Sequence, residues 1–335
     1  SRKDRRQSRR LYRQRDPNPA INNIGTVAGV YTTPSIYVEI TGAITNSNTM
    51  TPYRGAGRPE AAYVIERTID LAAHEIGIDP TELRRINTIS PDAMPFKTGL
   101  TFTYDCGEFE KNMDLTLEMA DYAGFELRRA ESAKAGKLRG IGVSNTIERA
   151  ATPGIEAAEI RVARGGSVTI MSGSCTQGQG HETVFKQIVC DKLGLRPEDV
   201  NYVWGDTDKV AFGHGTGGSR SATLGGSAVM MATDKIIEKA RKIAAHQLEA
   251  ADEDIVFDEG VFSVTGTDRS LKFTDIAKSA ADPGKIPGDM EPGLNEDATY
   301  TATTMNYPNG CHVCEVEIDP DTGVVDILNY NVVDD

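Results

Sequence analysis

The sequence predicts an α+β fold, in which mixed sheets and helices form two subdomains. Its 335 residues fit about two domains of ordinary size. Segments with apolar residues at helical spacing and segments with alternating residues follow each other without strict strand–helix–strand alternation. The expected elements change from mainly helices to mainly hairpins near residue 135. We therefore expect a first domain over 1–135 and a second domain over 136–335.

The elements of the first domain are expected to be mainly helical. Three of them are helices and one is a strand with turns: we assign the strand to 24–46 and the helices to 60–76, 80–87 and 113–131. DPTE at 79–82 is a strong helix start, with Asp79 as the cap, Pro80 at the first position and Glu82 reaching back. The last helix is expected to stop near Gly136.

The second domain is expected to contain hairpins and two long helices. A first hairpin turns at Gly165 and Gly166. The other assignments are a strand over 138–147, a helix over 181–194, a strand starting near 201, a helix ending near 249, hairpins over 255–266 and 311–333, and a loop over 282–297. The loop contains three Pro-Gly dipeptides.

Composition and charge exclude several classes of function. A net charge of −13 argues against a nucleic-acid partner or an anionic membrane surface. No apolar run approaches the roughly 18 residues of a membrane span. Five irregularly spaced cysteines fit a reducing compartment, so we expect a cytoplasmic protein. We interpret the basic segment 1–15 as a solvated helix or a segment that packs on an acidic partner, not as a nucleic-acid arm.

One glycine-rich loop precedes the helix expected over 181–194. Its residues are Gln177, Gly178, Gln179, Gly180 and His181. Glycine lets the backbone approach a ligand closely, and a glutamine amide offers a donor and an acceptor together. N–H groups at a helix start attract an anion. The loop therefore suits an anionic ligand with hydrogen-bonding edges.

A second loop precedes the long helix and has similar chemistry. Its residues are Gly217, Gly218, Ser219, Arg220 and Ser221. Backbone N–H groups, two hydroxyls and a guanidinium favour phosphate. Neither loop matches a standard nucleotide motif. On composition alone, either loop taken by itself can equally be an ordinary glycine turn and helix cap, whereas the presence of two such loops favours a ligand site.

A third loop, within segment 51–60, places Arg54 and Arg58 around two glycines before a helix. These arginines are either surface residues in a turn, or Arg54 faces a substrate or cofactor oxygen while Gly55 and Gly57 leave space there.

Three long motifs in order resemble one known family. YRGAGRPEAAYVIERTIDLAAHEIGIDPTELRRIN, GQGHETVFKQIVCDKLGL and GDTD followed by GTGGSRSATLGGSAV are similar to the molybdenum-binding large subunit of the molybdenum hydroxylases. That family contains xanthine dehydrogenase and aerobic carbon monoxide dehydrogenase. The resemblance runs from about residue 20 onward and implies that the chain is a fragment of such a subunit.

The resemblance implies a cofactor and a set of partners. Molybdenum is held by a molybdopterin, in bacteria usually the cytosine dinucleotide form, so no protein metal ligand is expected. The loops at 177–181 and 217–221, with Thr223 nearby, are expected to bind it, and Arg54 and Gly55 to lie beside the metal. Electrons are expected to leave through an iron–sulfur (FeS) subunit to an FAD subunit, in a dimer of heterotrimers.

The implied reaction is hydroxylation of an N-heterocycle or aldehyde with water. Gly55 stands where carbon monoxide oxidisers of the family carry a cysteine, which argues against carbon monoxide as substrate. In the family, a glutamate acts as the general base of the reaction. No residue of this sequence matches that glutamate, so we expect the fragment alone to be inactive. The alternative is a non-catalytic binding or scaffold protein that kept the fold. Cys311 and Cys314 are not expected to bind metal, because an alternating strand places them on opposite faces.

Overall fold

The computed structural model describes residues 23–41, 46 and 52–335, which form two compact units. Unit 1 contains the described residues up to Arg149 together with Asn306–Asp335, and unit 2 is Ala150–Met305. The basic segment 1–15 lies outside the described residues. The observed boundary between the units differs from the one expected near residue 135. The strand that follows residue 135 pairs with the C-terminal hairpin and therefore belongs to unit 1.

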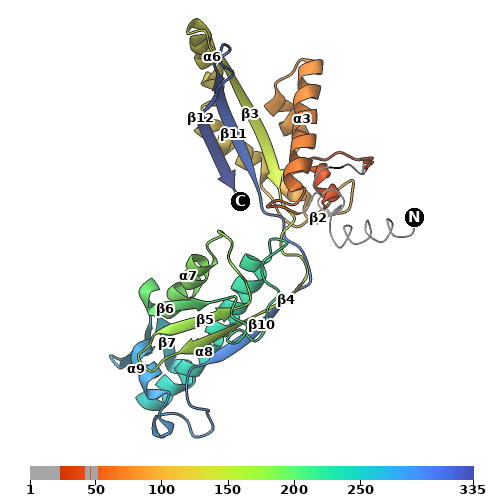
Figure 1. Cartoon of the computed structure of the whole chain (residues 1–335). Coiled ribbons are helices and arrows are strands. Elements are labelled where there is room, and N and C mark those ends of the chain that lie inside the picture. Colours follow the sequence, from red (N-terminus) through yellow and green to blue (C-terminus); the bar gives the residue numbers. More distant parts are fainter. Residues whose placement is uncertain (1–22, 42–45, 47–51) are drawn as a thin grey trace, which may run out of the picture. The chain divides into compact units, whose positions relative to one another are not determined.

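Unit 1 is built on a three-stranded antiparallel sheet in the order β12-β11-β3 (Figure 1). The strands are β3 (Leu138–Ile147), β11 (Asn309–Ile318) and β12 (Val325–Asp334). Helix α5 (Phe109–Met119) packs on β11 and β12, while α3 (Arg58–Ile76) and α6 (Phe125–Lys134) pack on β3. The remaining elements are α4 (Pro80–Asn87), β1 (Phe96–Lys97), β2 (Thr103–Tyr104) and the short 3₁₀ turns η1 (Ile24–Ala28), η2 (Pro91–Ala93) and η3 (Tyr122–Gly124).

Two expectations for unit 1 were wrong. The described part of 24–46 is not a strand: it begins with η1, and Tyr31 makes a single bridge to Thr88. Strand-favouring residues form a strand only where a neighbouring strand is available to pair. The helix expected over 113–131 is two helices, because Asp121 adopts a left-handed backbone with φ of 45° and breaks it. The capped start of α4 is confirmed, since the Asp79 side chain accepts from the N–H of Thr81.

A buried polar network joins α3, α4 and β3. Arg84 is fully buried and donates to Glu66 at 2.9 Å, to Asp70 at 2.9 Å and to the carbonyl of Val143 at 2.9 Å. Glu66 also accepts from the hydroxyl of Tyr31 at 2.6 Å. Burial by itself lowers the pKa of Arg84, but the charge of Glu66 raises it above its usual value. The network therefore holds a charged guanidinium inside unit 1.

Unit 2 contains a four-stranded sheet in the order β10-β4-β5-β6 and a three-stranded sheet β7-β8-β9. The first sheet is formed by β4 (Gly154–Val162), β5 (Val168–Ser172), β6 (Val200–Val203) and β10 (Glu296–Ala302). The second is formed by β7 (Ile255–Asp258), β8 (Val261–Val264) and β9 (Ser270–Lys272). The helices are α7 (His181–Leu193), α8 (Gly226–Leu248) and α9 (Phe273–Ser279), with short helical turns η4 (Pro197–Asp199), η5 (Ser221–Gly225), η6 (Asp252–Asp254) and η7 (Pro283–Lys285).

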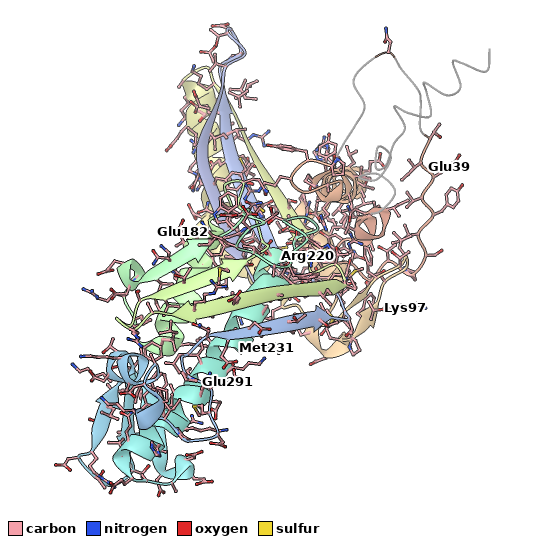
Figure 2. The ribbon with its side chains drawn as sticks, turned by 60° about the horizontal axis from the view of Figure 1, so that its bottom comes forward. Glu39, Lys97, Glu182, Arg220, Met231 and Glu291 are labelled. Carbon is pink, nitrogen blue, oxygen red and sulfur yellow. The ribbon has the colours of Figure 1, made fainter. Side chains whose placement is uncertain are left out.

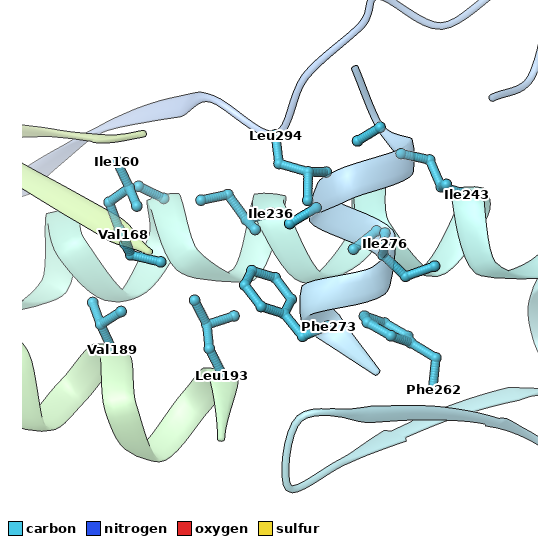
Figure 3. Packing of buried hydrophobic residues seen from close by; sticks show 14 of the residues in the cluster. Ile160, Val168, Val189, Leu193, Ile236, Ile243, Phe262, Phe273, Ile276 and Leu294 are labelled. Carbon is cyan, nitrogen blue, oxygen red and sulfur yellow. The ribbon is translucent and has the colours of Figure 1, made fainter. Parts of the chain in front are cut away.

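The core of unit 2 lies between α8 and its neighbours. Fully buried Ile236 and Ile243 of α8 lie among residues of β4, β5, α7, β8 and α9, such as Ile160, Leu193 and Phe273 (Figure 3). Burying each such side chain stabilises the fold by about 1.5–3 kcal/mol. The apolar spacing of α8 therefore fixes which face of this helix points inward.

The order of strands in unit 2 was not expected. β4 and β5 form the hairpin that Gly165 and Gly166 indicated, but β5 and β6 pair in parallel. Parallel neighbours need a crossover, and α7 provides it. The loops that follow β5 and β6 therefore leave the same edge of the sheet. Ligands bind preferentially outside this edge in sheets with parallel strands.

Candidate functional site

The first glycine-rich loop runs from the end of β5 to the start of α7. Gly180 is the N-cap of α7, with φ of 76° and no side-chain cap, and Gly178 has φ of 107°. The first N–H groups of α7 therefore have no capping side chain and suit an anion. Gln177 and Gln179 are exposed, and the amide of Gln179 donates to the Gln177 side chain at 3.0 Å.

The second loop follows β6 and ends in a wide helical turn, Ser221–Gly225, before α8. Such π-type turns are rare and are frequent at functional sites. Gly218 and Ser219 have positive φ values of 64° and 51°. Serine seldom adopts this conformation, which marks a strained position. Gly217, Gly218 and Ser219 are exposed, whereas Ser221 is buried.

The two loops contact each other. The hydroxyl of Thr216 donates to the carbonyl of Cys175 at 2.5 Å and lies 3.0 Å from that of Ser221. Gly173 and Gly213 are in backbone contact, since a Cβ built on Gly173 would lie 2.2 Å from the Cα of Gly213. The structure thus brings the predicted segments 177–181 and 217–221 into one continuous region at the edge of the sheet.

Arg220 faces into unit 2. Arg220, labelled in Figure 2, directly precedes the turn Ser221–Gly225. Its side chain is 15% exposed, lies 3.3 Å from the carboxylate of Glu156 and donates to the carbonyl of Ile155. The guanidinium is thus engaged with β4. The phosphate contact that the sequence suggested for Arg220 stays a prediction.

Sequence reasoning missed Glu156. In β4, the buried residues are Glu156, Ala158 and Ile160, which alternate with more exposed ones. Glu156 occupies one of the alternating strand positions that face inward, and a glutamate at such a position was the signal that could have identified it. Burial raises the pKa of Glu156, while the charge of Arg220 acts in the opposite direction.

His181 begins α7 and is 7% exposed. Its ring stacks on Phe185, with 5.8 Å between centroids. Burial lowers its pKa below the usual value, so the ring is neutral at pH 7. Its Nδ1 atom is buried without a hydrogen bond of normal geometry. His181 therefore supplies packing at the base of the first loop, next to the backbone of Cys175.

The third predicted loop belongs to unit 1. Arg54 is exposed in a turn that precedes α3, and Gly55 has φ of 100°. Arg58 is buried, and it donates to the carbonyls of Gly55 and Arg149. Arg58 therefore fixes the turn that presents Arg54. Gly55 and Arg58 also line a cavity of about 520 Å³ together with Glu148 and His312.

The cysteines and the helices add two observations. Cys311 is buried and Cys314 is half-buried, on opposite faces of β11, as alternation predicted. Among the described residues, no group of three or more His, Cys, Asp or Glu side chains is arranged to hold a metal ion. Over the same residues, every helix is too short or too polar to cross a membrane.

Comparison with known proteins gives a consistent picture. Two family models, both described as molybdopterin cofactor-binding domain, match residues 11–88 and 115–335. The chain is 35% identical to 6-hydroxypseudooxynicotine dehydrogenase complex subunit gamma of Paenarthrobacter nicotinovorans, over 96% of this chain and 41% of that protein. It is 34% identical to the carbon monoxide dehydrogenase large chain of Hydrogenophaga pseudoflava, over 92% of this chain and 40% of that protein.

A solved structure has a similar fold. Quinoline 2-oxidoreductase from Pseudomonas putida 86 matches with a TM-score of 0.81 and 30% identity, over 93% of this chain and 42% of that chain. The chain thus spans less than half of the length of the relatives that it matches. The matches and the mixed α/β fold agree in assigning the chain to the molybdopterin-binding large subunits of the xanthine dehydrogenase and carbon monoxide dehydrogenase family.

Proposed function

We propose that the chain is part of the catalytic subunit of a molybdenum hydroxylase. The whole enzyme would hydroxylate an N-heterocycle or an aldehyde with oxygen from water. Its cofactor would be molybdopterin cytosine dinucleotide, and partner subunits would carry FeS clusters and FAD. We place the enzyme in the cytoplasm as a dimer of heterotrimers. One observation carries the proposal: two glycine-rich loops meet at the edge where parallel strands β5 and β6 end.

The residues of this region fit a large anionic ligand. The helix that follows the first loop starts without a side-chain cap. A Cβ built on Gly178, Gly180 or Gly217 would meet nothing within 4 Å, so the backbone is open on these sides. Positive φ values at Gly178 and Gly180 direct the chain into the uncapped turn. Backbone N–H groups in such turns form a concave anion site.

Each predicted residue has a separate role toward the cofactor. The N–H groups at the starts of α7 and η5 would bind phosphate oxygens. Gln177 and Gln179 hydrogen-bond to each other in the structure. On binding, they would replace some of these bonds with hydrogen bonds to the donor and acceptor groups of the pterin or nucleotide. Ser219, Ser221 and Thr223 would orient the same ligand with their hydroxyls. When bound, the cofactor would supply the redox chemistry and activate the water molecule whose oxygen is transferred to the substrate.

The turn of unit 1 bears on the substrate. A Cβ built on Gly55 would lie 2.5 Å from the ring of Pro59, and its φ of 100° is unfavourable for other residues. The turn thus has no room for the cysteine expected in carbon monoxide oxidisers. This supports an organic substrate, with Arg54 beside the metal as an exposed cation that orients it.

The test uses the full-length subunit and measures bound molybdenum and cytosine nucleotide. Gln179→Ala and Ser219→Gly should each lower both contents in parallel, because each removes a hydrogen bond to the ligand worth about 0.5–1.5 kcal/mol, or roughly 2- to 13-fold in affinity. Glycine is chosen at Ser219 because it keeps the positive φ.

Gln187→Ala is the matched control, since this exposed glutamine lies on α7 away from the loop. Its molybdenum and nucleotide contents should equal those of the unmodified subunit. Wild-type full-length protein that contains neither molybdenum nor nucleotide after expression with both available would contradict the proposed function.

A further inference from the structure

Glu156 is a buried charge that the proposed cofactor contacts do not use. Its side chain is 1% exposed. Burial raises the pKa of its carboxylate, and the approaching backbone N–H groups of Ala157 and His214 act in the opposite direction, although neither forms a hydrogen bond of normal geometry. The guanidinium of Arg220 is its nearest cation, at 3.3 Å. A buried carboxylate is costly unless it is paired, so its retention in a strand core needs an explanation.

The carboxylate lies directly under the crossing of the two loops. Cβ atoms built on Gly173 and Gly213 would lie 3.1 Å and 3.2 Å from its Oε1 atom. These two glycines are themselves in backbone contact. Glu156 therefore contacts the first loop at Gly173 and the second loop at Gly213, and it pairs with Arg220 where the second loop ends. One side chain of β4 meets both loops.

Arg220 connects this carboxylate to the exposed part of the second loop. It follows Gly218 and Ser219, whose positive φ values make the turn. The loop is also tied to the segment that precedes β4, since the N–H of Ala151 donates to the carbonyl of Ser219 at 3.2 Å. The Nε atom of Arg220 is buried without a hydrogen bond. Arg220 is thus held mainly by the charge of Glu156 and the carbonyl of Ile155.

We infer that Glu156 is a positioning residue: through Arg220 and the Gly173–Gly213 crossing, it fixes the two loops in the relative positions that receive the cofactor. Arg220 then acts mainly inward, as the anchor of the second loop. This inference rests on the proposed function for its ligand. The structural part of the inference is that one buried ion pair keeps both loops ordered, and this part does not depend on which ligand binds.

The experiment measures local hydrogen exchange and cofactor content in the full-length subunit. Glu156→Gln keeps the shape of the side chain but removes its charge, so Arg220 should turn toward solvent and release the second loop. We expect about tenfold faster exchange in segments 173–180 and 212–221, with little change in the helices. Molybdenum and cytosine nucleotide content should fall in parallel.

A double variant separates positioning from general stability. Glu156→Gln with Arg220→Gln leaves a neutral pair, and its loop exchange should be slower than that of Glu156→Gln alone, because no unpaired cation remains. Arg220→Lys keeps the charge without the planar fork and should give intermediate exchange. Glu159→Gln is the control: it lies on the same strand with a 33% exposed side chain and pairs with Arg161.

Three outcomes would overturn the inference. They are unchanged loop exchange in Glu156→Gln, equal acceleration throughout unit 2, and additive effects in the double variant. If Glu156→Gln does not fold, Arg220→Lys becomes the deciding variant. Normal hydrogen exchange of the loops in Arg220→Lys would then contradict the role of Arg220 as the anchor of the second loop. Normal cofactor content in the wild type with disturbed loops in the variants would still support the positioning role. A wild-type protein without cofactor would contradict the proposed function. The hydrogen-exchange data would still test whether Glu156 and Arg220 position the loops.

Discussion

At the scale of single residues, close backbone approach decides where glycine is required. Gly173 and Gly213 touch, and neither has space for a Cβ. Gly217 lies only four residues beyond Gly213, yet a Cβ there would meet nothing within 4 Å. The sequence shows all three as glycines in glycine-rich segments. Only the packing of one loop on the other distinguishes a glycine that is required for contact from one that leaves space.

We therefore predict different costs for alanine at these positions. Gly173→Ala should lower the free energy of unfolding of unit 2 by about 1–3 kcal/mol, because two backbone segments must move apart. Gly217→Ala should change it by less than about 0.5 kcal/mol. Urea unfolding followed by Trp204 fluorescence measures this, since the chain has one tryptophan and it lies in unit 2. Equal effects of the two variants would contradict the packing argument.

At the scale of elements, charged pairs join helices to strands that are distant in sequence. Glu315 of β11 is buried and accepts from Arg128 of α6 at 3.1 Å and from Arg139 of β3 at 2.6 Å. Burial by itself raises the pKa of Glu315, but the hydrogen bonds from both arginines bring it below its usual value. Because 187 residues separate Glu315 from Arg128 and 176 separate it from Arg139, no local pattern in the sequence indicated this pairing.

The depressed pKa predicts a pH dependence with a definite sign. A glutamate with a lowered folded-state pKa contributes its full stability above the unfolded value of about 4.3 and loses it as the pH falls through the folded value. At pH 7, Glu315→Gln should destabilise unit 1 by about 2–3 kcal/mol. Between pH 5 and pH 3 the variant should lose less stability than the wild type, measured by hydrogen exchange of β3 and β11.

Glu126→Gln is the control for this pH dependence. Glu126 pairs with Arg129 on α6, but its side chain is 76% exposed. Such a pair contributes about 0–1 kcal/mol. The control should therefore follow the wild type at every pH. The same loss of stability on acidification in Glu315→Gln and wild type would show that the pair does not titrate as argued.

At the scale of the whole molecule, the two units differ in their connectivity. Unit 2 is one continuous stretch, Ala150–Met305, whereas unit 1 needs Asn306–Asp335 to complete its sheet. We predict that residues 150–305, expressed alone, fold and unfold in one cooperative transition, because their core cluster lies within this stretch. Residues 23–149 alone should lack this behaviour, since only β3 of the three strands remains. Circular dichroism during urea unfolding measures both, and a non-cooperative 150–305 would contradict the prediction.

The sequence by itself determined the local elements that have strong local causes. The Asp79 cap set the start of α4, alternation and Gly165–Gly166 set the β4–β5 hairpin, and apolar spacing set α7 and α8. It also marked both glycine-rich loops as candidate cofactor-binding segments, because glycine, glutamine and hydroxyl residues before a helix have a chemistry that does not depend on distant contacts.

Tertiary structure alone decided what depends on partners far away in the chain. It decided that residues 24–41 form no strand, that β5 and β6 run in parallel, and that β11 and β12 return to unit 1. It also turned Arg220 inward onto Glu156. The physical reason is common to these cases: hydrogen-bond pairing of strands and pairing of buried charges are satisfied between segments whose proximity no local pattern encodes.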